Sequence, residues 1–163
     1  LEIIQPDMEY MRYRCMISDL EVVEFGQIPW ALKATVECDG PYAYQRPKTF
    51  TLNGSGKLSL YNDSGHNGYY FPVIDISLSG GGNISIVNES DGGREFALNN
   101  VPTMATSVKV DCDHEIITCN AGLNMYEYFN FNFLRLKRGK NILNITSPGT
   151  VQITCEFPVN AGG

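Results

Sequence analysis

Strict alternation of apolar and polar residues is the feature that most constrains how this chain can fold. Thr150–Phe157 alternates without a break, with Val151, Ile153, Cys155 and Phe157 on one side of the pattern. A period of two places alternate side chains on opposite faces of a β-strand, whereas a helix would need a period near 3.6. We therefore predict a strand here, with these four apolar residues facing inward.

The same alternation recurs along most of the chain. Ala31–Cys38 shows it clearly, and short segments rich in Gly, Asn and Asp separate the repeats, as hairpin turns require. The further strands expected are Thr49–Leu52, Lys57–Tyr61, Tyr70–Leu78, Asn83–Val87, Glu95–Leu98, Ser107–Cys112, Glu115–Cys119, Phe131–Leu136 and Asn141–Thr146. The best helix candidate, Ala121–Asn130, contains Gly122 and has no sustained apolar stripe. Strands at this spacing predict an all-β fold, an antiparallel β-sandwich or barrel.

A boundary between two structural parts is expected near residue 45. Gln45–Lys48 contains a proline and is typical of an extended connector. Before it, residues 10–38 predict two long strands joined at Gly26–Pro29, and such a pair is not stable alone in water. The chain also opens at Leu1 rather than Met. We therefore expect residues 1–45 to be the remnant of a truncated N-terminal domain, and residues 46–163 to form the β-sandwich domain.

The charge balance and the hydropathy exclude two classes of partner. The chain has 12 basic and 18 acidic residues, for a net charge of -6, whereas nucleic-acid binding needs clustered Lys and Arg. The densest basic stretch, Arg135–Lys140, is interpreted as a solvated turn between strands. No apolar run approaches the ~20 residues that span a bilayer. We expect neither nucleic-acid binding nor membrane insertion.

Five cysteines, an odd number without a CxxC pair, support neither a complete disulfide framework nor a zinc site. Cys38 and Cys155 lie on the apolar phase of their strands and are expected to be buried. Cys112 and Cys119 flank a predicted hairpin and could form a disulfide, although free thiols in a reducing compartment are the favoured reading.

No catalytic motif is present, and we expect neither enzymatic activity nor a cofactor. The two histidines, His66 and His114, both lie in turns. A cysteine beside His114 would lack an orienting third group. Asp111, Asp113 and Glu115 alternate and could face a Ca²⁺ ion together, but a solvated acidic turn is the favoured interpretation.

Clustered aromatic residues offer one alternative function, because aromatic faces beside amide side chains can bind sugar rings. The candidate carbohydrate-binding residues are Tyr69, Tyr70, Asn124, Tyr126, Tyr128 and Asn130. The favoured interpretation is that these residues fill the core or lie flat on the strands.

Several motifs, taken in order, resemble the distal tail proteins of long-tailed phages and prophages. Trp30–Tyr44 (WALKATVECDGPYAY) resembles the closing strand and exit of the first domain of these proteins. Phe71–Asn88 (FPVIDISLSGGGNISIVN) is similar to their second domain, with a glycine-rich turn between two strands. Val110–Asp111, Gly122–Asn124 and Phe133–Ile142 (FLRLKRGKNI) complete the pattern.

The resemblance implies a fold and a structural role. Distal tail proteins have an N-terminal domain that forms a hexameric ring at the tail tip, and a C-terminal sandwich of galectin-like or carbohydrate-module-like jelly-roll type. The implied partners are the tail tube, the tail-associated lysin and the receptor-binding protein. The implied location is the virion tail tip, after synthesis in the bacterial cytoplasm. The alternative is a carbohydrate-binding adhesion module that contacts a host-surface saccharide.

Overall fold

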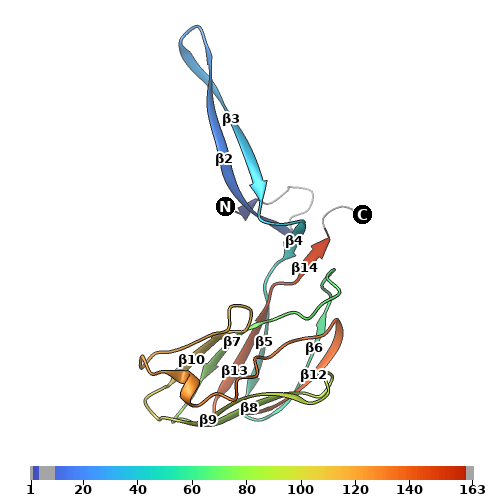
Figure 1. Ribbon diagram of the computed structural model, residues 1–163, viewed down its shortest axis with the longest axis vertical. Helices are drawn as coiled ribbons and strands as arrows, with labels where there is room; N and C mark the ends of the chain where they lie inside the picture. Colours follow the sequence, from blue (N-terminus) through green and yellow to red (C-terminus); the bar gives the residue numbers. More distant parts are fainter. Residues whose placement is uncertain (1, 4–9, 161–163) are drawn as a thin grey trace. The chain divides into compact units, whose positions relative to one another are not determined.

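The computed structural model describes residues 2–3 and 10–160, and these residues form two compact units. One unit comprises the described residues within Leu1–Arg46 and Pro158–Gly163, and the other is Pro47–Phe157. Both units consist of antiparallel strands, so the predicted all-β fold is confirmed (Figure 1). In the described residues no helix is long and apolar enough to cross a membrane.

The unit Pro47–Phe157 is a β-sandwich of two antiparallel sheets (Figure 1). The five-stranded sheet has the order β11 (Ile116–Cys119), β10 (Ser107–Asp111), β7 (Val73–Ser77), β13 (Thr150–Cys155) and β5 (Lys48–Asn53). The four-stranded sheet has the order β6 (Gly56–Asn62), β12 (Gly139–Thr146), β8 (Gly82–Asn88) and β9 (Arg94–Val101). Two neighbouring pairs, β10 with β11 and β8 with β9, are consecutive in the chain, whereas others, such as β13 with β5 and β12 with β6, join strands far apart in sequence.

Alternate residues of these strands form the core between the two sheets. Val151, Ile153, Cys155 and Phe157 are all fully buried, as their alternation predicts. The central strands of the other sheet bury Ile84, Ile86, Leu143 and Ile145 in the same way. Burial of such side chains supplies the main driving force for the fold.

The segment Phe131–Leu136, predicted to be a strand, is not one. Phe131 has a φ of 60°, which interrupts an extended backbone, and the neighbours Phe133 and Leu134 are both buried, which alternation forbids. In place of a ladder, an isolated bridge pairs Leu136 with Tyr70. The helix candidate Ala121–Asn130 contains a single 3₁₀ turn, η1 (Met125–Glu127).

The other unit is a small sheet from which a long hairpin extends. Its strands run in the order β1 (Glu2–Ile3), β2 (Met11–Phe25), β4 (Tyr42–Gln45) and β14 (Pro158–Asn160), and β3 (Ile28–Cys38) pairs with β2 alone. Gly26 and Gln27, with φ values of 59° and 67°, make the two-residue turn between β2 and β3. From Cys15 onward, β2 pairs only with β3 among the described residues.

Candidate functional site

The hairpin formed by β2 and β3 exposes an unusual amount of apolar surface, and residues 16–36 are named here the apolar hairpin. Its exposed large apolar residues are Met16, Ile17, Leu20, Val22, Val23, Phe25, Ile28, Trp30, Leu32 and Val36. Phe25 is 82% exposed and Trp30 is 79% exposed. Contiguous apolar surface of this kind marks a site where another surface binds, since each such side chain gains about 1.5–3 kcal/mol when buried.

One face of the apolar hairpin is apolar along its middle, through the pairs Ile17/Val36, Leu20/Ala34 and Val22/Leu32. The alternate pairs Asp19/Thr35 and Glu21/Lys33 make the other face polar there. Nearer the turn, Val23 lies opposite Ala31 on this other face of the ribbon. The one ion pair across the strands, Lys33 with Glu21 at 3.6 Å, is exposed and adds little stability. An exposed apolar face reaches low free energy only when it is covered, as in an assembly.

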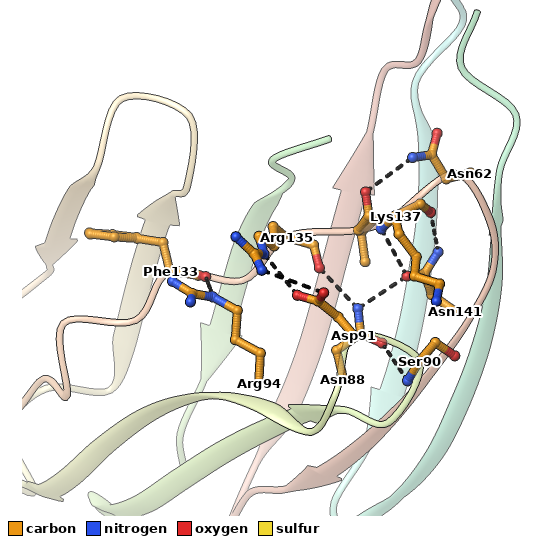
Figure 2. Close-up of polar contacts among 10 residues, drawn as sticks. Asn62, Asn88, Ser90, Asp91, Arg94, Phe133, Arg135, Lys137 and Asn141 are labelled. Carbon is orange, nitrogen blue, oxygen red and sulfur yellow. Dashed lines mark hydrogen bonds and ion pairs between the residues drawn. The ribbon is translucent and has the colours of Figure 1, made fainter. Parts of the chain in front are cut away.

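A second feature is a buried polar cluster in the sandwich, made of Asn62, Asn88 and Asn141, named here the asparagine cluster (Figure 2). The amide of Asn88 donates to the side-chain oxygen of Asn141 at 3.0 Å and to the carbonyl of Arg135 at 2.9 Å. The amide of Asn141 donates to the carbonyls of Lys137 and Gly139, at 2.7 and 3.0 Å. The cluster therefore holds the irregular segment 135–139 against β8 and β12.

Arg135 extends this network to Asp91 (Figure 2). Its Nε donates to Asp91 at 2.8 Å, and its guanidinium carbon lies 3.8 Å from the centre of the Tyr69 ring. Burial of the Asp91 carboxylate raises its pKa, but hydrogen bonds and positive charge from Arg135 and Arg94 outweigh this, so the pKa lies below the ordinary value. The reading of the basic stretch as fully solvated is wrong at Arg135, because this partner was not visible in the sequence.

Replacing Asp91 with asparagine should lower the free energy of unfolding by about 1–3 kcal/mol at neutral pH, because a charge-assisted hydrogen bond is lost. The pKa of Asp91 is lower in the folded state, so its contribution is present above the unfolded pKa of about 4 and is lost as the pH falls through the folded value. The free energies of unfolding of the native protein and of Asp91→Asn, measured by denaturation, should converge in acid. The exposed Asp113→Asn is the control; an equal difference at all pH values would contradict the assignment.

Each tyrosine among the candidate carbohydrate-binding residues makes a contact within the fold. Tyr70 is half-buried, its hydroxyl accepts from the backbone N–H of Glu156 at 2.7 Å, and burial raises the pKa of Tyr70 to about 12. The hydroxyl of Tyr126 donates to the carbonyl of Glu115. Tyr128 is half-buried against the core, and Tyr69, although 42% exposed, has Arg135 over its ring.

The two candidate asparagines also have structural hydrogen bonds. Asn124 caps η1, accepting from the N–H of Tyr126 at 3.3 Å. Asn130 donates to the carbonyl of Glu95 and accepts from the N–H of Ala97, at 2.9 and 3.1 Å. Sugar binding at these positions would therefore compete with contacts that the fold already makes.

The acidic turn at Asp111–Glu115 forms hydrogen bonds within itself, and the nearby cysteines are free thiols. Asp111 accepts hydrogen bonds from the backbone of Asp113 and His114, and no cluster of His, Cys, Asp and Glu in the described residues could hold a metal ion. Cys112 and Cys119 are both free thiols. Cys38 was predicted to be buried and is exposed, because no second layer covers the apolar hairpin in the described part of the chain.

Comparison with known proteins places this structure in a family. Residues 42–155 match the family described as phage tail C-terminal domain. The chain belongs to this family. As a member of the phage tail C-terminal domain family, the protein is a component of the virion tail, and the resemblance to phage tail proteins found in the sequence is confirmed.

A solved structure has a similar fold. It is the crystal structure of the Dit (gp 19.1) protein of SPP1, described as a paradigm of the hub adsorption apparatus in phages that infect Gram-positive hosts. The two share 16% sequence identity with a TM-score of 0.63, over 96% of this chain and 64% of that one. This chain therefore spans about 64% of the length of the SPP1 protein. No curated protein matches the chain.

Proposed function

We propose that this phage tail protein is a structural component of the tail tip, where it connects the tail tube to adhesion or receptor-binding proteins. The observation that carries the proposal is the apolar hairpin, whose exposed apolar side chains suit a subunit of a larger assembly. Its fold resembles that of a protein described as part of a hub adsorption apparatus. In the assembled particle the hairpin lies between neighbouring copies or against adjoining tail proteins, including the tail tube and the tail-associated lysin.

The sandwich supplies a rigid body rather than a reaction centre. The asparagine cluster and the Asp91–Arg135 pair engage their polar groups in holding the irregular segment 135–139. A scaffold needs side chains whose hydrogen bonds are satisfied internally and remain fixed during assembly. We therefore propose a role without catalysis.

Electron microscopy of particles labelled with a gold-conjugated antibody against this chain tests the proposed position. We expect gold at the distal end of the tail, at the tip that contacts the host. Particles that lack the gene product provide the control for antibody specificity. Label along the length of the tube, or at the head–tail junction, would contradict the proposal.

A glycan array that includes bacterial cell-wall polysaccharides should show no measurable binding, because the candidate residues are engaged within the fold. Tyr69 is the most accessible of the candidate tyrosines, so Tyr69→Ala is the informative variant, with Tyr70→Ala and Tyr126→Ala beside it. Millimolar or tighter binding that Tyr69→Ala abolishes, with folding unchanged, would favour a carbohydrate-binding adhesion module instead.

A further inference from the structure

Two cysteines face each other at the base of the apolar hairpin. Cys15 on β2 and Cys38 on β3 are paired in the strand register, and their sulfur atoms lie 3.1 Å apart. Their separation along the chain is 23 residues, with the whole of the apolar hairpin between them. The sequence alone did not show this pair, because the turn was expected at Gly26–Pro29, whereas the structure pairs Phe25 with Ile28 around a turn at Gly26 and Gln27.

The backbone geometry at this pair suits a covalent bond. The N–H of Asp39 donates to the carbonyl of Arg14 at 2.9 Å, which makes Arg14 and Asp39 a hydrogen-bonded pair. Hydrogen-bonded and non-hydrogen-bonded residue pairs alternate along an antiparallel ladder. The next pair, Cys15 with Cys38, is therefore a non-hydrogen-bonded pair, in which the two Cα atoms approach to about 4.5 Å. That separation lies within the range of disulfides, about 4.4–6.8 Å.

We propose that Cys15 and Cys38 form an intramolecular disulfide that closes the base of the apolar hairpin once the protein leaves the reducing cytoplasm. The oxidant is a small disulfide of the glutathione class. The thiolate of Cys38 attacks one sulfur of the oxidant, whose S–S bond breaks and releases one thiolate. The thiolate of Cys15 then attacks the sulfur of Cys38 and releases the second thiolate. The protein loses two protons and two electrons, and the small disulfide becomes two thiols.

The order of the two steps follows from how accessible each cysteine is to the oxidant. Cys38 is exposed, whereas Cys15 is only 8% exposed, so the reagent reaches Cys38 first. A surface pocket lined by both cysteines together with Glu2, Arg14 and Asp39 gives a small molecule room beside the sulfurs. The contact with Cys38 raises the pKa of Cys15, which is consistent with Cys15 acting second, after the mixed disulfide has removed that contact.

The other three cysteines provide an internal comparison. Burial raises the pKa of Cys112 and of Cys155 to about 12, and the sulfur of Cys119 contacts the backbone of Leu123. None of the three has the paired, accessible geometry of Cys15 and Cys38. Oxidation should therefore be selective and lower the number of free thiols from five to three.

The experiment is peptide mapping of the full chain after incubation in reduced or oxidised glutathione. Remaining thiols are alkylated under denaturing conditions, and a lysine-specific protease then cleaves the chain without reduction. Cleavage after Lys33 and Lys48 separates Cys15 from Cys38, because Lys33 is the only lysine between them. We expect the peptide 1–33 to be recovered linked to the peptide 34–48 in the oxidised sample, and both to be free after reduction.

Two variants complete the test. Cys15→Ser should retain four alkylatable thiols in oxidised glutathione, apart from a reversible glutathione adduct on Cys38, and Cys119→Ser should still form the linked peptides. Five free thiols in the oxidised native protein, or a disulfide only between copies of the chain, would overturn the proposal. Since mapping is done on the native sequence, a variant that failed to fold would leave this result unaffected.

Discussion

Replacing both Trp30 and Leu32 with aspartate should abolish incorporation of the protein into tails while leaving the sandwich folded. Both side chains are exposed, at 79% and 68%, and both lie on the apolar hairpin that we propose to be covered in the assembly. Loss of two buried apolar contacts, at about 1.5–3 kcal/mol each, weakens association by about 10²- to 10⁴-fold. Two carboxylates placed in an apolar interface add a further desolvation cost.

Complementation of a phage that lacks the gene measures this effect as a loss of plaques and of tail-associated protein. Tyr61→Asp is the matched control, because Tyr61 is 64% exposed but lies on β6 of the sandwich. Circular dichroism and thermal unfolding of the purified variants establish that the sandwich is intact. Normal incorporation of the double variant would show that the apolar hairpin is not an assembly surface.

Replacing Asn141 with leucine should lower the free energy of unfolding of the sandwich by about 2–4 kcal/mol, the largest effect that we expect from one substitution in the asparagine cluster. The change removes the acceptor for the N–H of Lys137 and for the amide of Asn88, and the donor to two backbone carbonyls. Buried polar groups left without partners carry their full desolvation cost, and leucine cannot replace them.

Urea denaturation provides the measurement, with Asn144→Leu as the control because Asn144 is exposed on the same strand. The control should change the free energy of unfolding by less than about 0.5 kcal/mol. If Asn141→Leu were equally mild, segment 135–139 would be held by its apolar contacts instead. Hydrogen exchange of the Lys137 amide would then remain slow in the variant.

The strands with regular alternation were predictable because their pattern reports burial directly. Thr150–Phe157 is an example: the inward residues follow from a period of two, and the structure buries all four. The same reasoning was wrong for Phe131–Leu136. A positive φ at Phe131 and side-chain hydrogen bonds from Asn88 and Asn141 set the path of this segment. Hydrogen bonds between residues far apart in sequence leave no periodic signal.

The functional surfaces were less predictable than the fold. Alternation identified Leu32 and Val36 as one apolar face, but only the structure showed that neither face of the hairpin is covered within the described chain. The pairing of Arg135 with Asp91 and of Cys15 with Cys38 depends on long-range packing or register. Carbohydrate binding by Tyr69 and its companions stays a prediction, with a structure that gives most of these side chains another role.

The two register shifts in the apolar hairpin, at Ile17/Asp19 and Val23/Glu24, have a consequence for how copies of this protein can accumulate without harm. A flat ribbon with an exposed apolar face would stack on copies of itself, as strands do in amyloid fibrils. Bulges coil a ribbon and increase its right-handed twist, so each added copy is rotated relative to the last and flat stacking becomes unfavourable. We expect the hairpin to support a closed assembly with a fixed number of subunits, and to resist growth into filaments while newly made protein awaits its place in the particle.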